Sequence, residues 1–356
     1  MRNKKKVLIN LTGFGNVHFG FGQVASGFAK YLRAALPDDL EFVFLFRGSY
    51  VGRPDDGIKY VRLRWFHRYF PFFLPAVDVW HDIHQYCKVS PWSGRTKRIL
   101  TVHDLNFLYE KPPKKARKYL CKLRRKAASA DVLTAISEFT AEDIRTHLNV
   151  GQKQVRVIYN GVENLRDLPE VRPSFVADPG RKFFFTIGQV RRKKNFHVLL
   201  DAMRSFPDTD LYIVGERDGF YAEQIFARIA GENIRNVFLV GVCTESEKVW
   251  LYRHCHAFLF PSLFEGFGLP VVEAMQFGKP VFAARSTSLP EICGGHAFLW
   301  ERFEPEYLSE SIKDFLKVFY ADEKRAEDEM KYADTFDYGT NVEAYVNLYR
   351  ALAQGE

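Results

Sequence analysis

The sequence has few cysteines and no long apolar run, and each of these absences excludes a class of protein. Its 356 residues include five cysteines, which are far apart and form no CxxC pair. Such thiols are typical of a reduced cytoplasmic protein, so we expect neither a disulfide framework nor a zinc site. No apolar stretch approaches the ~20 residues of a membrane-spanning helix. The apolar residues after the basic N-terminal cluster are interrupted at Asn10, Thr12 and Gly13, which predicts no signal peptide.

Acidic residues are scarce in the first part of the chain. Residues 1–150 contain 26 Lys and Arg against 13 Asp and Glu, whereas residues 151–356 contain 25 against 30. Such an uneven charge indicates that the basic part meets an anionic partner. The densest cluster lies at residues 111–126, with nine basic residues and no acidic one. Residues 62–75 combine arginines with Trp, Phe and Tyr.

Two interpretations of residues 62–75 and 111–126 stay open. Aromatic rings at headgroup depth and cations on lipid phosphates suit peripheral contact with an anionic membrane, at the inner face of the cytoplasmic membrane. A solvated helix face and a buried aromatic loop explain the same composition without a partner. The basic composition also suits nucleic acid, but no motif supports that partner, and we expect no nucleic-acid binding.

Apolar segments of two kinds alternate along the chain. Buried strands are predicted at residues 6–10, 40–46, 77–80, 98–104, 131–137 and 154–162, and again at 182–188, 210–216, 236–242, 256–262 and 280–286. Segments of helical spacing separate them, and Ser137 is placed to cap one such helix. This alternation predicts parallel sheets in two α/β domains. Residues 163–180 have little pattern and three prolines, which is typical of a linker.

Glycines follow the first predicted strand, at positions 13, 15, 20 and 22, before a segment of helical spacing that starts at residue 23. A strand, a glycine-rich loop and a helix are the opening of a βα unit. Backbone N–H groups at Gly20 and Gly22 are candidates for binding a diphosphate. The spacing is not a full GxGxxG fingerprint, so a turn that simply requires glycine is the alternative.

The most informative segment is residues 261–280, PSLFEGFGLPVVEAMQFGKP, which places Glu265 and Glu273 eight positions apart. A predicted strand ends at Pro261, and Pro270 suits the first turn of a helix. Glycines before that turn allow backbone N–H groups to approach an anion at the positive end of the helix dipole. Two carboxylates beside a phosphate-binding turn suit a ligand with phosphates and many hydroxyls, which is a nucleotide sugar.

These residues also carry a family resemblance. Residues 261–274 match the E-x7-E signature of retaining glycosyltransferases of family 4, which include bacterial mannosyl- and glucosyltransferases. Five more segments resemble that family in the same order along the chain: VHDLNF (102–107), ISEFT (136–140), VIYNGV (157–162), IGQVRRKKNFHVLLDAM (187–203) and TSLPEI (287–292). The resemblance implies the α/β fold called GT-B, in which two Rossmann-like domains face each other across a cleft. Residues 1–165, joined by a C-terminal helix at 340–356, would bind the acceptor, and residues 166–339 the nucleotide sugar.

The resemblance also implies roles for individual residues. His103, Lys194 and Glu265 are the implied catalytic residues: His103 hydrogen-bonds the donor sugar, Lys194 neutralises the departing diphosphate, and Glu265 contacts the sugar hydroxyls. Glu273 would bind the ribose. The full set of implied donor-binding residues is Gly20, Gly22, Gly188, Gln189, Arg192, Lys194, Val240, Val242, Glu265, Gly266, Phe267, Gly268, Leu269 and Glu273.

One position departs from the family pattern. Gln189 stands where the family usually has Arg, and an amide cannot supply a positive charge to a diphosphate. Arg191, Arg192 or Lys193 would compensate, or the diphosphate is held differently.

No metal ion and no cofactor are expected. Asp208 and Asp210 form a DxD sequence but lie in a predicted turn, and His81 and His84 lack a third ligand. Retention of configuration is implied, by front-face substitution in which a leaving phosphate oxygen takes the acceptor's proton. A covalent intermediate would require a carboxylate on the opposite face of the sugar.

The sequence thus predicts a retaining, metal-independent hexosyltransferase. It would use a nucleotide sugar, with GDP-mannose favoured by the HDLNFL segment and UDP-sugars left open. The acceptor would be a glycan or lipid-linked sugar in bacterial cell-surface polysaccharide or lipopolysaccharide biosynthesis. The alternative is a nucleotide-sugar epimerase of the same two-domain fold.

Overall fold

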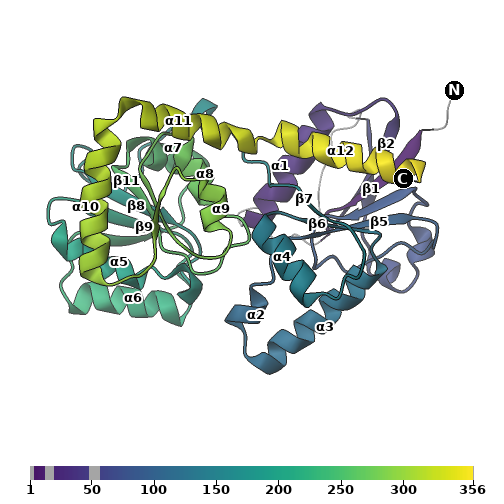
Figure 1. The fold of residues 1–356 in the computed structure, drawn as a ribbon, viewed down its shortest axis with the longest axis horizontal. Coiled ribbons are helices and arrows are strands. Elements are labelled where there is room, and N and C mark those ends of the chain that lie inside the picture. Colours follow the sequence, from purple (N-terminus) through teal and green to yellow (C-terminus); the bar gives the residue numbers. More distant parts are fainter. Residues whose placement is uncertain (1–3, 13–19, 48–56, 356) are drawn as a thin grey trace. The chain divides into compact units, whose positions relative to one another are not determined.

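A computed structural model describes residues 4–12, 20–47 and 57–355. The chain forms two compact units (Figure 1). Unit 1 comprises Met1–Val162 and Phe336–Glu356, and unit 2 comprises Glu163–Thr335. Each unit contains one sheet, and every strand pair in both sheets is parallel. The predicted α/β class with parallel sheets is therefore confirmed.

Within the described ranges, the sheet of unit 1 has seven strands in the order β3-β2-β1-β4-β5-β6-β7. The strands are β1 (Lys5–Asn10), β2 (Leu40–Phe46), β3 (Ile58–Arg62), β4 (Val79–Asp82), β5 (Lys97–Val102), β6 (Val132–Ala135) and β7 (Val155–Val157). The order reverses between β1 and β4, which is the topological switch point of such a sheet. The edge strand β3 was not predicted, because its sequence IKYVR is short and half polar.

Helices cover both faces of this sheet. One face packs on α1 (Gly20–Ala34) and on α12 (Tyr338–Gln354), through a core that includes Phe28, Phe42 and Val346. The other face is covered by α3 (Pro113–Ser129), α4 (Glu138–His147) and the chain between β3 and β4. A short α2 (Phe107–Glu110) precedes α3. The side chain of Ser137 accepts a hydrogen bond from the Thr140 N–H, so the predicted cap of α4 is confirmed.

Buried hydrogen bonds attach the C-terminal helix α12 to the sheet of unit 1. The His81 ring lies 2.7 Å from the Tyr349 hydroxyl at Nδ1 and 2.7 Å from the Thr101 hydroxyl at Nε2. The hydroxyl of Tyr345 lies 3.1 Å from that of Thr101. All four residues are buried, so this network both satisfies the polar groups and fixes the position of α12.

The sheet of unit 2 has six strands in the order β10-β9-β8-β11-β12-β13. They are β8 (Phe183–Ile187), β9 (Asp210–Val214), β10 (Val237–Gly241), β11 (Ala257–Phe260), β12 (Val281–Ala284) and β13 (Phe298–Trp300). Here the order reverses between the neighbours β8 and β11. The three-residue edge strand β13 was not predicted.

Seven helices accompany this second sheet in the part of the chain that the structure describes. They are α5 (His197–Ala202), α6 (Phe220–Gly231), α7 (Glu245–His254), α8 (Leu269–Met275), α9 (Leu289–Cys293), α10 (Pro305–Ala321) and α11 (Glu323–Ala333). Helix α5 packs against α10, and α8 packs against α11 and α9. Among the described residues, none of the helices in either unit combines the length and the apolar character that crossing a membrane requires.

Candidate functional site

An ion pair lies at the switch point of unit 2. Lys194 follows β8 in a 3-10 turn, η4 (Arg192–Lys194), and Glu265 follows β11. The Lys194 Nζ atom lies 2.5 Å from Glu265 Oε1. Because β8 and β11 are adjacent and parallel, their carboxyl ends meet at one edge of the sheet. Ligands of open α/β sheets bind at this kind of edge.

The absence of a side chain at Gly188 leaves room for the side chain of Lys194. Gly188 directly follows β8 with a φ of 151°, and a Cβ there would lie 2.9 Å from Lys194 Cε. The Lys194 ammonium also lies 4.7 Å from the centre of the Phe260 ring, at the end of β11. Asn195 follows in the left-handed conformation and ends the turn. The Lys194 side chain is therefore directed along the sheet edge toward Glu265.

Polar groups from two loops hold Glu265. The Ser262 hydroxyl donates to Glu265 Oε1 at 2.6 Å, and the Glu265 N–H donates to the Thr287 hydroxyl at 3.0 Å. The Ser288 hydroxyl donates to the Glu265 carbonyl at 3.1 Å. Burial disfavours the carboxylate, but the charges of Lys194 and Lys193 outweigh it and lower the pKa of Glu265 below its ordinary value. Glu265 is therefore an ionised, fixed carboxylate.

The second glutamate of the motif is held from helix α7. Lys248 Nζ lies 2.8 Å from Glu273 Oε1, and the Tyr252 hydroxyl donates to Glu273 Oε2 at 2.9 Å. Burial opposes the charge of Lys248, but the Glu273 carboxylate outweighs it and raises the lysine's pKa. Neither of these two partners of Glu273 was predicted from the sequence. The available signal was a lysine inside an otherwise buried helical segment, residues 248–252.

Three glycines close the carboxyl ends of β8, β9 and β10. Gly188, Gly215 and Gly241 all have positive φ angles. A Cβ on Gly215 would lie 1.8 Å from the Gly188 carbonyl oxygen, so only glycine allows these two strand ends to pack. The Gly215 N–H donates to the Gly241 carbonyl at 2.7 Å. The strand ends therefore form one continuous backbone surface beside Lys194.

The side chains around this surface are mostly polar or exposed. Gln189 donates from its amide to Glu216 at 3.3 Å, and Arg192 is exposed. Val242 is 75% exposed just after β10, and Val240 is half-buried. The neutral amide of Gln189 thus pairs with a carboxylate. Arg217 extends the same edge and donates to the Leu239 carbonyl at 3.3 Å.

The Gly-Phe-Gly turn precedes α8, which begins at Leu269 as predicted. Gly268 has a φ of 107°, and a Cβ there would lie 2.7 Å from the Leu289 side chain. Gly266 is half-buried, but Phe267 is buried in the core of unit 2. The phenyl ring of Phe267 is therefore not on the surface, and its carbonyl accepts a hydrogen bond from the Ser288 hydroxyl at 3.0 Å.

Unit 1 places His103 directly after β5. The ring is buried, and its Nε2 lies 2.8 Å from the Ile83 carbonyl. The backbone N–H of His103 donates to the side-chain oxygen of Gln85 at 2.9 Å. Burial lowers the pKa of His103 to about 4, so the imidazole is neutral at pH 7. Since a carbonyl only accepts, Nε2 carries the hydrogen. The His84 ring packs beside it at a centroid distance of 4.8 Å.

Two of the candidate diphosphate-binding glycines, Gly20 and Gly22, lie in a helix. Gly20 and Gly22 belong to the first turn of α1, three residues before the position at which the sequence predicted its start. Gly13 and Gly15 lie outside the described residues. The expectation of a loop at Gly20 and Gly22 is therefore wrong, because the helical hydrogen bonds begin at Gly20.

In the two sequences that resemble metal-binding motifs, His81 and Asp210 have other partners. His81 belongs to the buried network with Thr101 and Tyr349. Asp210 begins β9 and lies 2.7 Å from Arg181, at the opposite end of the strand from Gly215. Across residues 4–12, 20–47 and 57–355, no group of three His, Cys, Asp or Glu side chains is placed to hold a metal ion.

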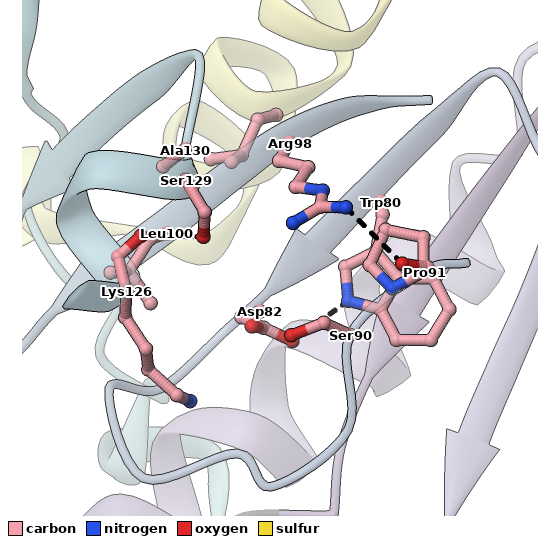
Figure 2. A pocket seen from close by; sticks show the side chains of 10 residues that line it. Trp80, Asp82, Ser90, Pro91, Arg98, Leu100, Lys126, Ser129 and Ala130 are labelled. Atoms are coloured by element: carbon pink, nitrogen blue, oxygen red, sulfur yellow. Dashed lines mark hydrogen bonds between the residues drawn. The ribbon is translucent and has the colours of Figure 1, made fainter. Parts of the chain in front are cut away.

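A small pocket in unit 1 is too narrow for a substrate. It lies between β4 and the end of α3, among Trp80, Asp82, Arg98 and Lys126 (Figure 2). Its volume is about 10 Å³, which is room for about one water molecule. Asp82 accepts hydrogen bonds there from Trp80 and Asn10. This pocket therefore belongs to the packing of unit 1.

Comparison with known proteins identifies the family. The model described as Glycosyltransferase Family 4 matches residues 33–164, and the model described as Glycosyl transferases group 1 matches residues 167–333. The chain belongs to glycosyltransferase family 4. The two matches meet close to the division between unit 1 and unit 2.

Two curated relatives come from Escherichia coli. "Serotype-specific mannosyltransferase WbdA" is 27% identical over 264 residues, which are 68% of this chain and 30% of the relative. "O-antigen chain mannosyltransferase B" is 24% identical over 273 residues, which are 72% of this chain and 71% of the relative. The family 4 chain thus spans about 30% of the length of WbdA.

Solved structures establish the fold. Sucrose-phosphate synthase from Thermosynechococcus elongatus matches with a TM-score of 0.77 at 18% identity, over 99% of this chain and 100% of that one. Anabaena Alr3699/HepE in complex with UDP-glucose matches with a TM-score of 0.73 at 17% identity, over 98% and 100%. The glycosyltransferase WaaG matches with a TM-score of 0.71 at 16% identity, over 96% and 99%. The expected GT-B fold is confirmed.

Proposed function

We propose that this family 4 chain transfers a hexose from a nucleotide sugar to a glycan or lipid-linked sugar, in the synthesis of a bacterial surface polysaccharide or lipopolysaccharide. The observation that carries the proposal is the Lys194–Glu265 ion pair at the switch point of unit 2. Mannose is the favoured sugar, since relatives are named mannosyltransferases. UDP-sugars stay open, since a structure of similar fold is a complex with UDP-glucose.

The proposed chemistry assigns Lys194 to the departing diphosphate. Negative charge grows on the leaving oxygen, and a fixed cation is the largest stabilisation that a protein can supply there. An ammonium has three hydrogens, of which Glu265 takes one. Glu265 would use its remaining acceptor capacity for sugar hydroxyls, and its charge would favour an oxocarbenium-like transition state. Glu273 would accept hydrogen bonds from the ribose.

The other predicted contacts complete the donor site. The backbone at Val240–Val242 would flank the base, and the turn from Gly266 to Leu269 would face the diphosphate. Arg192 would supply a charge that Gln189 lacks. His103 would hydrogen-bond the sugar as a neutral imidazole, consistent with its lowered pKa. Gly20 and Gly22 would contribute N–H groups from the first turn of α1.

Retention is part of the proposal. Front-face substitution, with the leaving phosphate oxygen taking the acceptor's proton, requires no protein base. Proton NMR of the product distinguishes the outcomes, because an α-linked donor sugar gives an α-linked product under retention. An inverted anomer would contradict this mechanism.

Metal independence is proposed separately. The diphosphate charge is assigned to Lys194 and Arg192, so transfer should continue after treatment with a chelator. Loss of activity in EDTA, restored by magnesium or manganese, would contradict this assignment. An epimerase is not favoured, because both family models describe transferases.

Ligand-induced stabilisation tests the donor. A nucleotide sugar at 100 times its Kd stabilises the native state by about 2.7 kcal/mol, which raises Tm by several degrees. We expect GDP-mannose to give the largest shift in a panel of nucleotide sugars, and transfer to follow with that donor. The Lys194→Met variant should lose the shift, whereas Lys324→Met, an exposed lysine in α11, should keep it. If no nucleotide sugar stabilises the protein, the proposal is wrong.

A further inference from the structure

Unit 1 exposes a cluster of aromatic rings that its own core does not use. Trp65 is 80% exposed, Tyr69 67% and Phe73 63%, and Phe70 and Phe72 are exposed as well. Arg62, Arg64 and Arg68 are exposed among them, and residues 57–75 include no acidic residue. The alternative interpretation of a buried aromatic loop is therefore wrong for these five rings.

This cluster has a defined local structure. The segment folds into two 3-10 turns, η1 (Trp65–Arg68) and η2 (Pro71–Phe73). Leu74 is buried and packs on the sheet. His67 is buried as well, and the Arg64 N–H donates to its Nδ1 at 3.0 Å. Burial lowers the pKa of His67, so this acceptor remains neutral at pH 7. The exposed rings are thus carried by a segment whose inner residues, His67 and Leu74, are buried.

Helix α3 covers the same face of the sheet as this cluster. Leu74 packs with Leu8 and Trp80 of the sheet, and Leu123 of α3 packs with Leu100. The strand register pairs Leu8 with Trp80, and Asp82, two residues further, with Leu100. Because side chains of register partners share a face, both segments lie on one side of the sheet.

The chain that follows β4 lies between the two segments, because its Val89 packs in one cluster with Leu74 and its Cys87 contacts α3. Lys126 of α3 donates a hydrogen bond to the Cys87 carbonyl. The small pocket between Pro91 and the end of α3 marks the same junction (Figure 2). Their outward surfaces therefore belong to one side of unit 1.

All charged residues on the outward face of α3 are basic. Ala116, Leu123 and Ala127 face the sheet, which turns Lys114, Lys118 and Arg125 to the opposite side. The exposed basic residues of this helix are Lys114, Lys115, Arg117, Lys118, Lys122, Arg124 and Arg125. A hollow of about 460 Å³ lies on it, lined by Pro112, Lys114, Lys115, Lys118, Tyr119 and Lys122. Such a hollow suits phosphate groups.

We propose that residues 62–75 and the outward face of α3, together the basic-aromatic face, dock on the surface of an anionic lipid bilayer. Trp and Tyr rings partition into the headgroup region, where one edge remains hydrated. Lysines and arginines with no acidic residues among them are attracted to anionic headgroups. Because the basic-aromatic face is positively charged, it favours an anionic bilayer over a neutral protein surface. The proposal goes beyond the transferase function and does not depend on it.

Vesicle co-sedimentation with the full chain tests the proposal. We expect binding to vesicles of phosphatidylglycerol and phosphatidylcholine, weak binding to pure phosphatidylcholine, and a decrease with added salt. The variant W65S/F72S/F73S should bind the anionic vesicles about tenfold more weakly or worse. The variant K114Q/K118Q/R125Q should also lose about tenfold or more.

Matched controls come from unit 2. The variant F220S/F226S removes two exposed rings of α6, and R235Q/K324Q removes two exposed charges. Both should bind vesicles as the unchanged protein does. All substituted side chains are exposed, so Tm should be unaffected. Equal vesicle binding by W65S/F72S/F73S and the unchanged protein would overturn the proposal.

Fluorescence supplies a second measurement on the unchanged protein. Trp65 is far more exposed than the buried Trp80, Trp250 and Trp300. Anionic vesicles should shift its emission to shorter wavelength, and brominated acyl chains should quench it. The variant W65F should bind vesicles but lose most of this signal, with W92F as control. The absence of an emission shift would contradict docking on lipid. Binding to oligonucleotides in place of vesicles, or self-association that depends on Trp65, would contradict it as well.

Discussion

Lys194 and Glu265 form a 2.5 Å ion pair although 71 positions separate them in the sequence. Both side chains are largely buried, at 11% and 15% exposed. Removing one partner of such a pair leaves an uncompensated charge, which destabilises a protein by more than the pair itself stabilises it. The same two residues are therefore needed for stability and are proposed to act on the donor.

Substitution of Glu265 separates these two effects. In Glu265→Gln the Ser262 hydroxyl keeps a hydrogen-bond acceptor, but Lys194 loses its counter-charge. We expect kcat to fall by about 100-fold or more and stability by about 1–3 kcal/mol. Glu265→Ala should abolish transfer. The double variant K194M/E265Q removes both charges, so it should recover stability in urea unfolding without recovering activity. Near-normal turnover in Glu265→Gln at saturating donor would overturn the assigned role.

The Lys248–Glu273 contact predicts a different kinetic signature. Lys248→Met leaves Glu273 with the Tyr252 hydroxyl as its remaining partner. Because Glu273 is assigned to the ribose and not to the reacting carbon, KM for the donor should rise about tenfold while kcat changes little. Tyr252→Phe is the matched control and should raise KM less, since it removes a neutral donor. Glu273→Ala should mainly weaken donor binding. A fall in kcat with unchanged KM would argue against a positioning role for Lys248.

The buried ring of His81 leads us to expect that the stability of unit 1 decreases at acid pH. Burial holds its pKa at about 3, against about 6.5 for an exposed histidine. As the pH falls below about 6.5, the unfolded chain takes up a proton that the native ring does not, so stability decreases toward acid. Between pH 7 and pH 5 this group costs about 2 kcal/mol. Urea unfolding at both pH values should show a smaller loss for His81→Gln. An equal loss in both proteins would exclude His81 as the cause.

Glu329 predicts a stabilising substitution in unit 2. Its carboxylate on α11 is fully buried, and neither oxygen has a hydrogen-bond partner among the described residues. Burial raises its pKa well above the ordinary value of 4.5. Above about pH 4.5 the unfolded chain releases a proton that the native state keeps, so stability falls as the pH rises toward the native pKa. Glu329→Met should therefore raise Tm, by more at pH 8 than at pH 5. Glu327→Met, at an exposed position of the same helix, should not do so. A gain in Tm that is equal at both pH values would exclude the titration of Glu329 as its cause.

The alternation of apolar runs and helical segments was sufficient to predict two parallel α/β sheets. Local chemistry also predicted the Ser137 cap and the start of α8 at Leu269, because caps and first-turn prolines act within a few residues. The edge strands β3 and β13 were missed, since a short strand at an edge needs only one apolar side. The start of α1 at Gly20 was missed because glycine by itself argues against a helix.

The sequence by itself determined the class of fold, the family and the spacing of Glu265 and Glu273, because these follow from periodicity and from motifs within one segment. Only the tertiary structure decided that Lys194 reaches Glu265, that Lys248 and Tyr252 hold Glu273, and that the rings around Trp65 lie outside the core. The physical reason is that these contacts depend on which strands are neighbours and which helix face turns inward. Neither is encoded in the spacing of residues along one segment.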